Sequence, residues 1–130
     1  MQANNNLIAN NYGYYGMMGF YAYSYNSGAY TFECRQNTIQ ADGAKANYTY
    51  QYIYAFYLYP YYHTTIDVAG NIVDVQNSYG AYPAYTYNTA LSSYKRWDHN
   101  TYYVKNVTYP TFYCPSGSAS DVTTWMSLNQ

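Results

Sequence analysis

The clearest pattern of hydrophobic and polar positions in the chain has a period of two and lies between residues 47 and 59. One set of alternate positions is Tyr48, Tyr50, Tyr52, Tyr54, Phe56 and Leu58. The other set is Thr49, Gln51, Ile53, Ala55, Tyr57 and Tyr59. Because successive side chains of a β-strand point to opposite faces, this period predicts a strand that ends at Pro60.

Shorter runs of the same kind predict further strands with turns between them. These runs cover residues 29–40, 61–68, 72–75, 84–88, 91–97, 101–109 and 122–128. Asp42-Gly43 and Ala69-Gly70-Asn71 are typical of hairpin turns, since Gly and Asn accept a positive φ. No stretch has helical periodicity with caps, and no repeat recurs at a fixed period. The pattern predicts an all-β fold, a single Ig-like or jelly-roll-like antiparallel β-sandwich of about seven or eight strands. A small barrel is the alternative.

The first 28 residues differ in composition from the rest of the chain. They contain no Asp, Glu, Lys or Arg and are rich in Asn, Gly and Tyr. Because ordering glycine costs much conformational entropy, this segment would not be ordered by itself. We therefore expect contacts with its own domain or with a neighbouring copy to hold it. We therefore divide the chain into an extended N-terminal segment, residues 1–28, and a β-sandwich domain, residues 29–130.

The composition favours a structural, secreted protein over an enzyme. Tyr accounts for 24 of 130 residues, and only 8% of residues are charged, with a net charge of −1. Typical proteins have about 25% charged residues, which keep soluble chains apart, so their scarcity favours association. The 5 basic residues form no stripe for nucleic acid. No run approaches the roughly 20 apolar residues of a membrane-spanning helix.

The residues that could carry chemistry are few. Cys34 and Cys114 fit no CxxC motif, and in an oxidising compartment we expect them to form a disulfide. Two buried free thiols are the alternative. His63 and His99 are far apart in the sequence and suggest neither a metal site nor a catalytic site. We predict no catalytic residue, no metal ion and no cofactor.

Two N-glycosylation sequons are present, Asn47-Tyr48-Thr49 and Asn106-Val107-Thr108. This motif accepts a glycan only in an exported protein. Because attached sugar would supply the solubility that the few charges do not, we expect covalent glycans on Asn47 and Asn106.

The N-terminal segment contains a run that alternates as an inserting strand does, Phe20-Tyr21-Ala22-Tyr23-Ser24-Tyr25. An uncharged extension followed by one β-domain resembles donor-strand-exchange pilins and tyrosine-rich glycosylated fibril proteins. The resemblance implies that the extension completes the sheet of a neighbouring copy. The residues at that subunit contact would be Phe20, Tyr21, Tyr23 and Tyr25. Repeated head to tail, the contact gives a filament. We therefore expect the structural subunit of a homopolymeric extracellular filament, whose partners are other copies of itself.

Two other functions stay open. Tyr and Trp rings stack on sugars, so Trp97 and Trp125 with nearby tyrosines could form a secreted carbohydrate-binding module. A viral shell or tail subunit is the third possibility, since it is another β-rich assembly. The tyrosines are spread along the whole sequence, whereas a sugar-binding face would concentrate them, so we favour contacts in the core or between copies.

Overall fold

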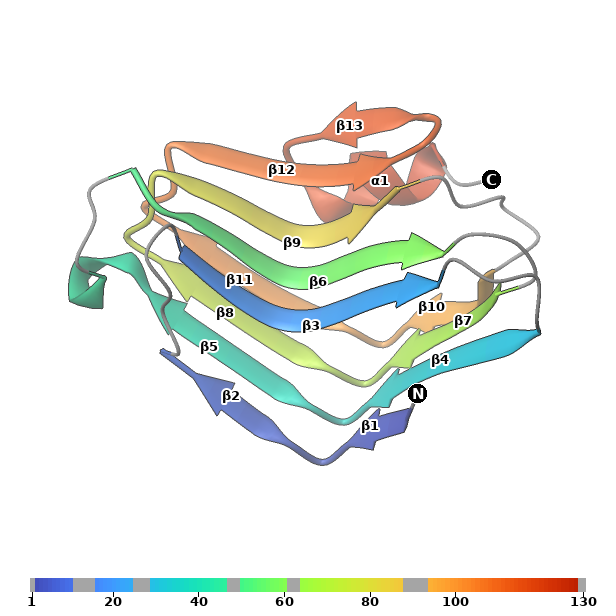
Figure 1. Cartoon of the computed structure of the whole chain (residues 1–130). Coiled ribbons are helices and arrows are strands. Elements are labelled where there is room, and N and C mark those ends of the chain that lie inside the picture. Colours follow the sequence, from blue (N-terminus) through green and yellow to red (C-terminus); the bar gives the residue numbers. More distant parts are fainter. Residues whose placement is uncertain are drawn as a thin grey trace.

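The computed structural model describes residues 2–10, 16–24, 29–46, 50–60, 64–87 and 94–128, and all that follows concerns these residues. The chain winds into stacked coils, with the first strands at one end and the C-terminal helix at the other (Figure 1). The elements are β1 (Gln2–Asn4), β2 (Leu7–Ala9), β3 (Gly16–Ser24), β4 (Tyr30–Arg35), β5 (Thr38–Asp42), η1 (Gly43–Lys45), β6 (Tyr52–Pro60), β7 (Thr64–Ala69), β8 (Ile72–Gln76), β9 (Gly80–Thr86), β10 (Tyr94–Asp98), β11 (Thr101–Lys105), β12 (Tyr109–Cys114), β13 (Gly117–Ala119) and α1 (Val122–Ser127).

Each coil contributes one strand to each of three sheets. Sheet A has the order β1-β4-β7-β10, sheet B the order β2-β5-β8-β11, and sheet C the order β3-β6-β9-β12-β13. Every pair of neighbours is parallel except β12 with β13. β1, β2 and β3 belong to the first coil, and they pair with β4, β5 and β6 of the same chain. The fold is a parallel β-solenoid, with coils about 4.8 Å apart along its axis.

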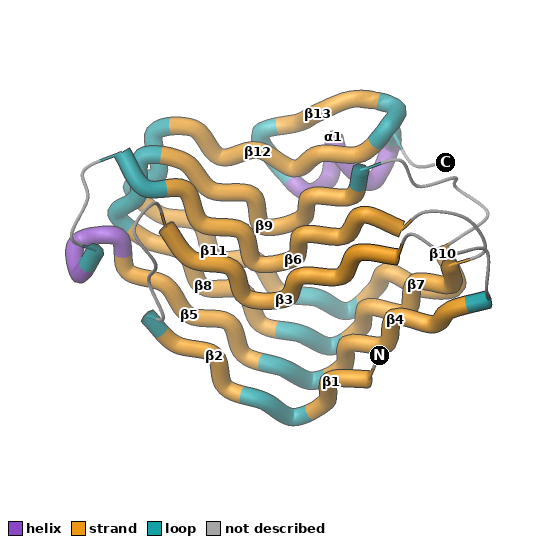
Figure 2. Tube along the Cα trace, viewed as in Figure 1, coloured by secondary structure: helices purple, strands orange, loops and turns teal. Residues whose placement is uncertain are grey.

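The structure is mostly β, as the sequence predicts, but the antiparallel β-sandwich with an extended N-terminal segment is wrong. The reason lies in the hydrogen bonds of the turns. In a hairpin the backbone groups beside the turn bond to each other. At Gly70-Asn71 they bond to the neighbouring coils instead: the Gly70 N–H donates to the Asp98 carbonyl, and the Ile72 N–H donates to the Asn37 carbonyl. The chain therefore passes from β7 in sheet A to β8 in sheet B instead of pairing the two strands (Figure 2).

The strands of sheet C bend at their middle, and the bend changes which side chains point inward. In β6, Ala55 and Phe56 are consecutive and both fully buried. The period of two is therefore interrupted: Phe56 and Leu58 join the core, and Tyr57 and Tyr59 point outward, on the same side as Tyr52 and Tyr54. The two predicted faces of this strand hence exchange places after Ala55.

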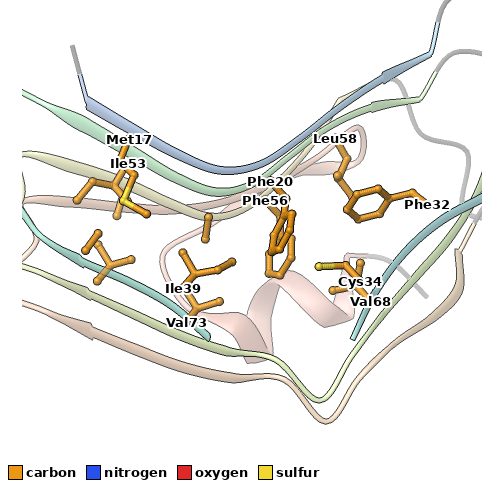
Figure 3. Close-up of a cluster of buried hydrophobic side chains, with 14 of the residues drawn as sticks. Met17, Phe20, Phe32, Cys34, Ile39, Ile53, Phe56, Leu58, Val68 and Val73 are labelled. Atoms are coloured by element: carbon orange, nitrogen blue, oxygen red, sulfur yellow. The ribbon is translucent and has the colours of Figure 1, made fainter. Parts of the chain in front are cut away.

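The core lies between sheet C and the layer formed by sheets A and B (Figure 3). Phe20 and Phe56 stack at 5.7 Å between ring centroids, above the corner where sheets A and B meet. Aliphatic side chains fill the space on both sides of them. Those without exposed surface include Ile39, Ile53, Ile66, Val68, Val73 and Val75. Each such side chain stabilises the fold by roughly 1.5–3 kcal/mol relative to an exposed one.

The C-terminal end of the solenoid is closed over its core. β13 folds back on β12, and α1 packs beside them (Figure 1). Trp125 of α1 is 2% exposed and contacts Trp97 and Phe112. The strand predicted at residues 122–128 is therefore wrong. The side chain of Asp121 accepts a hydrogen bond from the Thr124 N–H, and this N-cap is the helix signal that the sequence contains.

Candidate functional site

More than half of the 24 tyrosines lie together on or beside the outward side of sheet C. We call this surface the tyrosine face. It consists of Tyr21, Tyr23, Tyr50, Tyr52, Tyr54, Tyr57, Tyr59, Tyr79, Tyr82, Tyr85, Tyr87, Tyr109 and Tyr113. The strands of sheet C contain no Asp, Glu, Lys or Arg. The face is therefore aromatic and uncharged.

The parallel register arranges these rings in rows along the solenoid axis. The first row is Tyr21, Tyr57, Tyr85 and Tyr113, with centroids 5.3, 4.7 and 4.8 Å apart and planes at 27°, 15° and 16°. The second row is Tyr23, Tyr59 and Tyr87, at 5.0 and 4.8 Å. Rings inside a row cover each other's faces, so their edges and hydroxyl groups are the parts that point outward.

Four phenols of the face, those of Tyr54, Tyr57, Tyr79 and Tyr85, have a raised pKa. Burial, followed by the negative charges that neighbouring phenols such as Tyr82 would carry, raises the pKa of Tyr54 to about 12. Burial is also the main cause that raises the pKa of Tyr57, Tyr79 and Tyr85. At neutral pH the face is hence an array of protonated hydroxyl groups, each able to donate and to accept a hydrogen bond.

A shallow pocket of about 290 Å³ opens in the part of the face nearest the N-terminal end. Its lining consists of Gly16, Met17, Met18, Tyr52 and Tyr54. These residues carry no charge, and the pocket is at the small end of the range for ligand sites. Its chemistry fits a single ring-sized, mostly apolar group.

The outward side of sheet A has the opposite chemistry. Asp67 is 1% exposed, with Arg35 Nη2 at 2.5 Å from one carboxylate oxygen and Arg96 Nε at 2.8 Å from the other. The hydrogen bond from Arg35, aided by that from Arg96, lowers the pKa of the Asp67 carboxyl against the opposing effect of desolvation. Three further charged side chains lie within 4.0 Å of these residues: Glu33 near Arg35, Lys95 near Asp67 and Asp98 near Arg96. The cluster ties three successive coils together and neutralises its own charges.

Asparagines occupy the corner between sheets A and B in every coil. They are Asn6, Asn37, Asn71 and Asn100, and each Nδ2 donates to the Oδ1 of the next at 2.9, 3.0 and 2.8 Å. We call this series the asparagine ladder. Asn71, with no exposed surface, also accepts from the Asn37 N–H and donates to the Cys34 carbonyl. Because buried polar groups are costly unless hydrogen-bonded, the ladder fixes the position of this corner.

The predicted disulfide is wrong, since Cys34 and Cys114 are both free buried thiols. Cys34 lies on β4 in the second coil and Cys114 on β12 in the fourth. Two coils separate them by about 10 Å along the axis, farther than the roughly 4.4–6.8 Å that a disulfide allows between Cα atoms. Burial, partly opposed by a hydrogen bond from Asn37, raises the pKa of the Cys34 thiol to about 12.

The structure describes only one of the two predicted glycosylation sites. Asn47 lies outside the described residues. Asn106 is exposed at the corner between β11 and β12, with φ 53°, and not within a strand. Its Nδ2 donates to Asn77 Oδ1 at 3.0 Å, and Asn77 donates in turn to Asp42. Glycosylation of Asn106 stays a prediction.

The residues predicted for subunit contact do not share one environment. Phe20 is 6% exposed and belongs to the core of its own chain. Tyr21 and Tyr23 are 52% and 49% exposed and belong to the tyrosine face. Tyr25 lies outside the described residues. The two tryptophans considered for sugar stacking contact each other at the end of the core, where Trp125 has almost no exposed surface.

Sequence reasoning missed the asparagine ladder because its spacing is irregular. Successive members are 31, 34 and 29 residues apart. A signal does exist: each of these asparagines is followed by the first residue of a sheet B strand and then by an inward side chain. The four runs are Asn6-Leu7-Ile8, Asn37-Thr38-Ile39, Asn71-Ile72-Val73 and Asn100-Thr101-Tyr102.

Comparison with known proteins gives no relative from which a function could be inferred. Within the described ranges there is no helix with the length and apolar character needed to span a membrane. No protein-family model matches the chain, and no curated protein or solved structure has significant similarity to it.

Proposed function

We propose that the chain is a structural subunit that associates with copies of itself outside the cell, with the tyrosine face as the contact between copies. The observation that carries this proposal is the gathering of stacked, uncharged tyrosine rows on one side of sheet C. Tyrosine is enriched and charged residues are depleted at the centres of protein interfaces.

The spacing of the rows favours a second copy as the partner. The rings recur with the separation of parallel strands, about 4.8 Å. Another tyrosine face has the same repeat over several coils, and phenol hydroxyls can pair with one another because each both donates and accepts. Two such faces related by a two-fold axis are complementary to themselves. The extracellular setting rests on the composition and on the sequons.

A homopolymeric filament needs a second contact on each subunit, because face-to-face pairing alone closes at two copies. The head-to-tail strand exchange expected from the sequence stays a prediction, and it competes with two pairings inside the chain, β3 with β6 and β13 with Phe112–Cys114 of β12. Any second contact has to use another surface of the solenoid.

The proposal is tested by sedimentation velocity over a range of concentrations, with negative-stain electron microscopy of the associated species. Tyr23→Lys/Tyr87→Lys places two charges on the tyrosine face, at residues 49% and 39% exposed. Ile72→Lys/Tyr103→Lys is the matched control, with 49% and 48% exposed positions on sheet B. We expect the unmodified chain and the control to form large species and the face variant to lose them.

A chain that stays monomeric at every concentration contradicts the proposal. Equal loss of association in the sheet B control contradicts the role of the tyrosine face. Circular dichroism of each variant separates loss of association from loss of folding.

Carbohydrate binding is a second candidate, favoured by the pocket next to Tyr52 and Tyr54. Stacking on a sugar needs an open ring face, and the rings inside the rows have theirs covered. Only a site at the margin of the face, such as this pocket, could then serve. Binding on a glycan array that Tyr52→Ala abolishes, and that Tyr103→Ala retains, would support this function in place of self-association.

A further inference from the structure

We infer that the N-terminal edges of two copies pair antiparallel about a two-fold axis, so that the first coils of the two chains form continuous sheets. This contact uses a different surface from the tyrosine face and does not depend on it. The two ends of the solenoid differ in which strand edges they leave open.

In the described part of the chain, β1, β2 and β3 are the edge strands at the N-terminal end of sheets A, B and C. An edge strand presents backbone groups that can pair with another strand. The first tyrosine row ends here at Tyr21 and the asparagine ladder ends at Asn6. At the other end β10 and β11 are edge strands of sheets A and B, but in sheet C the antiparallel β13 pairs with Phe112–Cys114 of β12, and Trp125 fills the end of the core. A parallel strand of another copy cannot pair with this part of β12, so an N-terminal edge finds three matching edges only in another N-terminal edge.

The side chains of β3 have an order that permits this pairing. From Met17 to Ala22 the positions point in, out, in, in, out, in. Met17 and Phe20 are 2% and 6% exposed, whereas Met18 and Tyr21 are 48% and 52% exposed. A Cβ on Gly19 would point at Ile39 in the core, and Ala22 packs against the same core. The pattern reads the same in both directions about the midpoint between Gly19 and Phe20.

Two copies of β3 can therefore pair antiparallel about this midpoint without placing an inward residue opposite an outward one. Opposed residues of an antiparallel pair point to the same face. The opposed pairs are Gly16 with the partner's Tyr23, Met17 with the partner's Ala22, Met18 with the partner's Tyr21, and Gly19 with the partner's Phe20. In three of these four pairs a large side chain meets a small one, which lets the two surfaces interlock.

The same axis also satisfies the other two sheets. β3 lies above the corner between β1 and β2, so an axis through its midpoint passes close to this corner (Figure 1). That axis pairs β1 with β2 of the partner, and both strands have 3 residues. Ala3 and Ile8, which pack against the core, then face each other. All three edges are covered by one operation, which closes the assembly at this end.

The test is a pair of cysteines that can bond only in this register. Met18→Cys/Tyr21→Cys places each new thiol opposite its counterpart in the partner, with Cβ atoms about 4.5–5.5 Å apart. Within one strand the two positions are about 10 Å apart, so an internal disulfide cannot form. We expect mild oxidation to convert the double variant to a covalent dimer with two bonds, and this product to be lost in either single variant.

Tyr54→Cys/Tyr57→Cys is the matched control, since these residues lie in register with Met18 and Tyr21 on β6. β6 is flanked by β3 and β9, so edge pairing cannot link it. Cross-linking of this control but not of the β3 variant would support tyrosine-face contact and overturn the edge pairing. The reverse result would support edge pairing alone.

A folded Met18→Cys/Tyr21→Cys chain that stays uncross-linked overturns the proposal, as does equal cross-linking of Met18→Cys alone, which indicates another register. Small-angle X-ray scattering of the Tyr23→Lys/Tyr87→Lys chain gives a measurement that needs no cysteine. We expect a particle of twice the monomer mass, elongated along the solenoid axis, and a compact monomer contradicts the inference.

Discussion

The asparagine ladder and the tyrosine rows are built on the same repeat but lie in opposite environments. Both place one like residue on the next at the spacing of parallel strands, an arrangement that stabilises stacked β-structure in general. In the ladder the two middle amides, Asn37 and Asn71, are buried, and they bond to their neighbours in the ladder and to the backbone of the corner. In the rows the rings are partly exposed, and their hydroxyl groups remain directed outward. The comparison indicates that one series determines the fold, whereas the other is available for contact with a partner.

The largest effect should come from breaking the ladder. Asn71→Leu removes hydrogen bonds to the Asn37 N–H, the Cys34 carbonyl and the Asn100 side chain, all at a buried corner. Each buried group left unpaired costs about 1–3 kcal/mol, so the free energy of unfolding should fall by roughly 3–5 kcal/mol. Urea denaturation at pH 7 measures this change.

The outer corner supplies the control for that substitution. Asn106 also bonds to an asparagine of the next coil, Asn77, but it is exposed and has a positive φ. Asn106→Gly keeps that φ accessible and lets water replace the lost bond, so it should cost less than about 1 kcal/mol. Similar costs at Asn71 and Asn106 would show that burial does not distinguish the two sites.

A smaller effect should come from interrupting a tyrosine row. Tyr57 stacks on Tyr21 and on Tyr85, whereas Tyr21 is the last ring of the row. Aromatic pairs contribute about 0.5–1.5 kcal/mol each, so Tyr57→Leu should cost roughly 1–2 kcal/mol and Tyr21→Leu roughly half of that. Thermal and urea unfolding of the two variants give the comparison. In the edge-paired dimer the partner's Met18 also contacts Tyr21, so the comparison is made at a concentration at which the chain is monomeric. A larger loss at Tyr21 than at Tyr57 under that condition would contradict the contribution of stacking within the row.

The sequence predicts the strands better than their arrangement, and β6 shows why. Alternation from residue 47 to 59 identifies a strand, which the structure places at Tyr52–Pro60. Ala55 and Phe56 are both hydrophobic, so either one can face the core, and the shift from one face to the other cannot be read from the local pattern. Whether neighbouring strands are parallel depends on where the backbone groups of each turn find partners, and at Gly70-Asn71 these partners, Asp98 and Asn37, are far away in the sequence.

The candidate surface depends on the same missing information. Tyr21, Tyr57, Tyr85 and Tyr113 are far apart in the sequence, and only the parallel register brings them into one row. Their number indicates an association surface, but their gathering on sheet C follows from the fold. The thiols make the same point, since composition favours a disulfide and the coil positions of Cys34 and Cys114 prevent one.

The smallest effect per residue should come from alkaline pH, which acts on the tyrosines and leaves the amides of the ladder uncharged. Tyr has a pKa of about 10 in the unfolded chain, and the fold raises the pKa of Tyr54 to about 12. The unfolded state therefore loses its proton first, so this contribution to stability is complete below about pH 10 and is lost as the pH rises toward about 12. The urea midpoint of the unmodified chain should fall as the pH is raised above 8, and that of the Tyr54→Phe variant should fall less. Absorbance at 295 nm should show part of the phenols ionising only as the protein unfolds. An equal decline in both proteins would mean that burial on the tyrosine face does not restrain the ionisation of Tyr54.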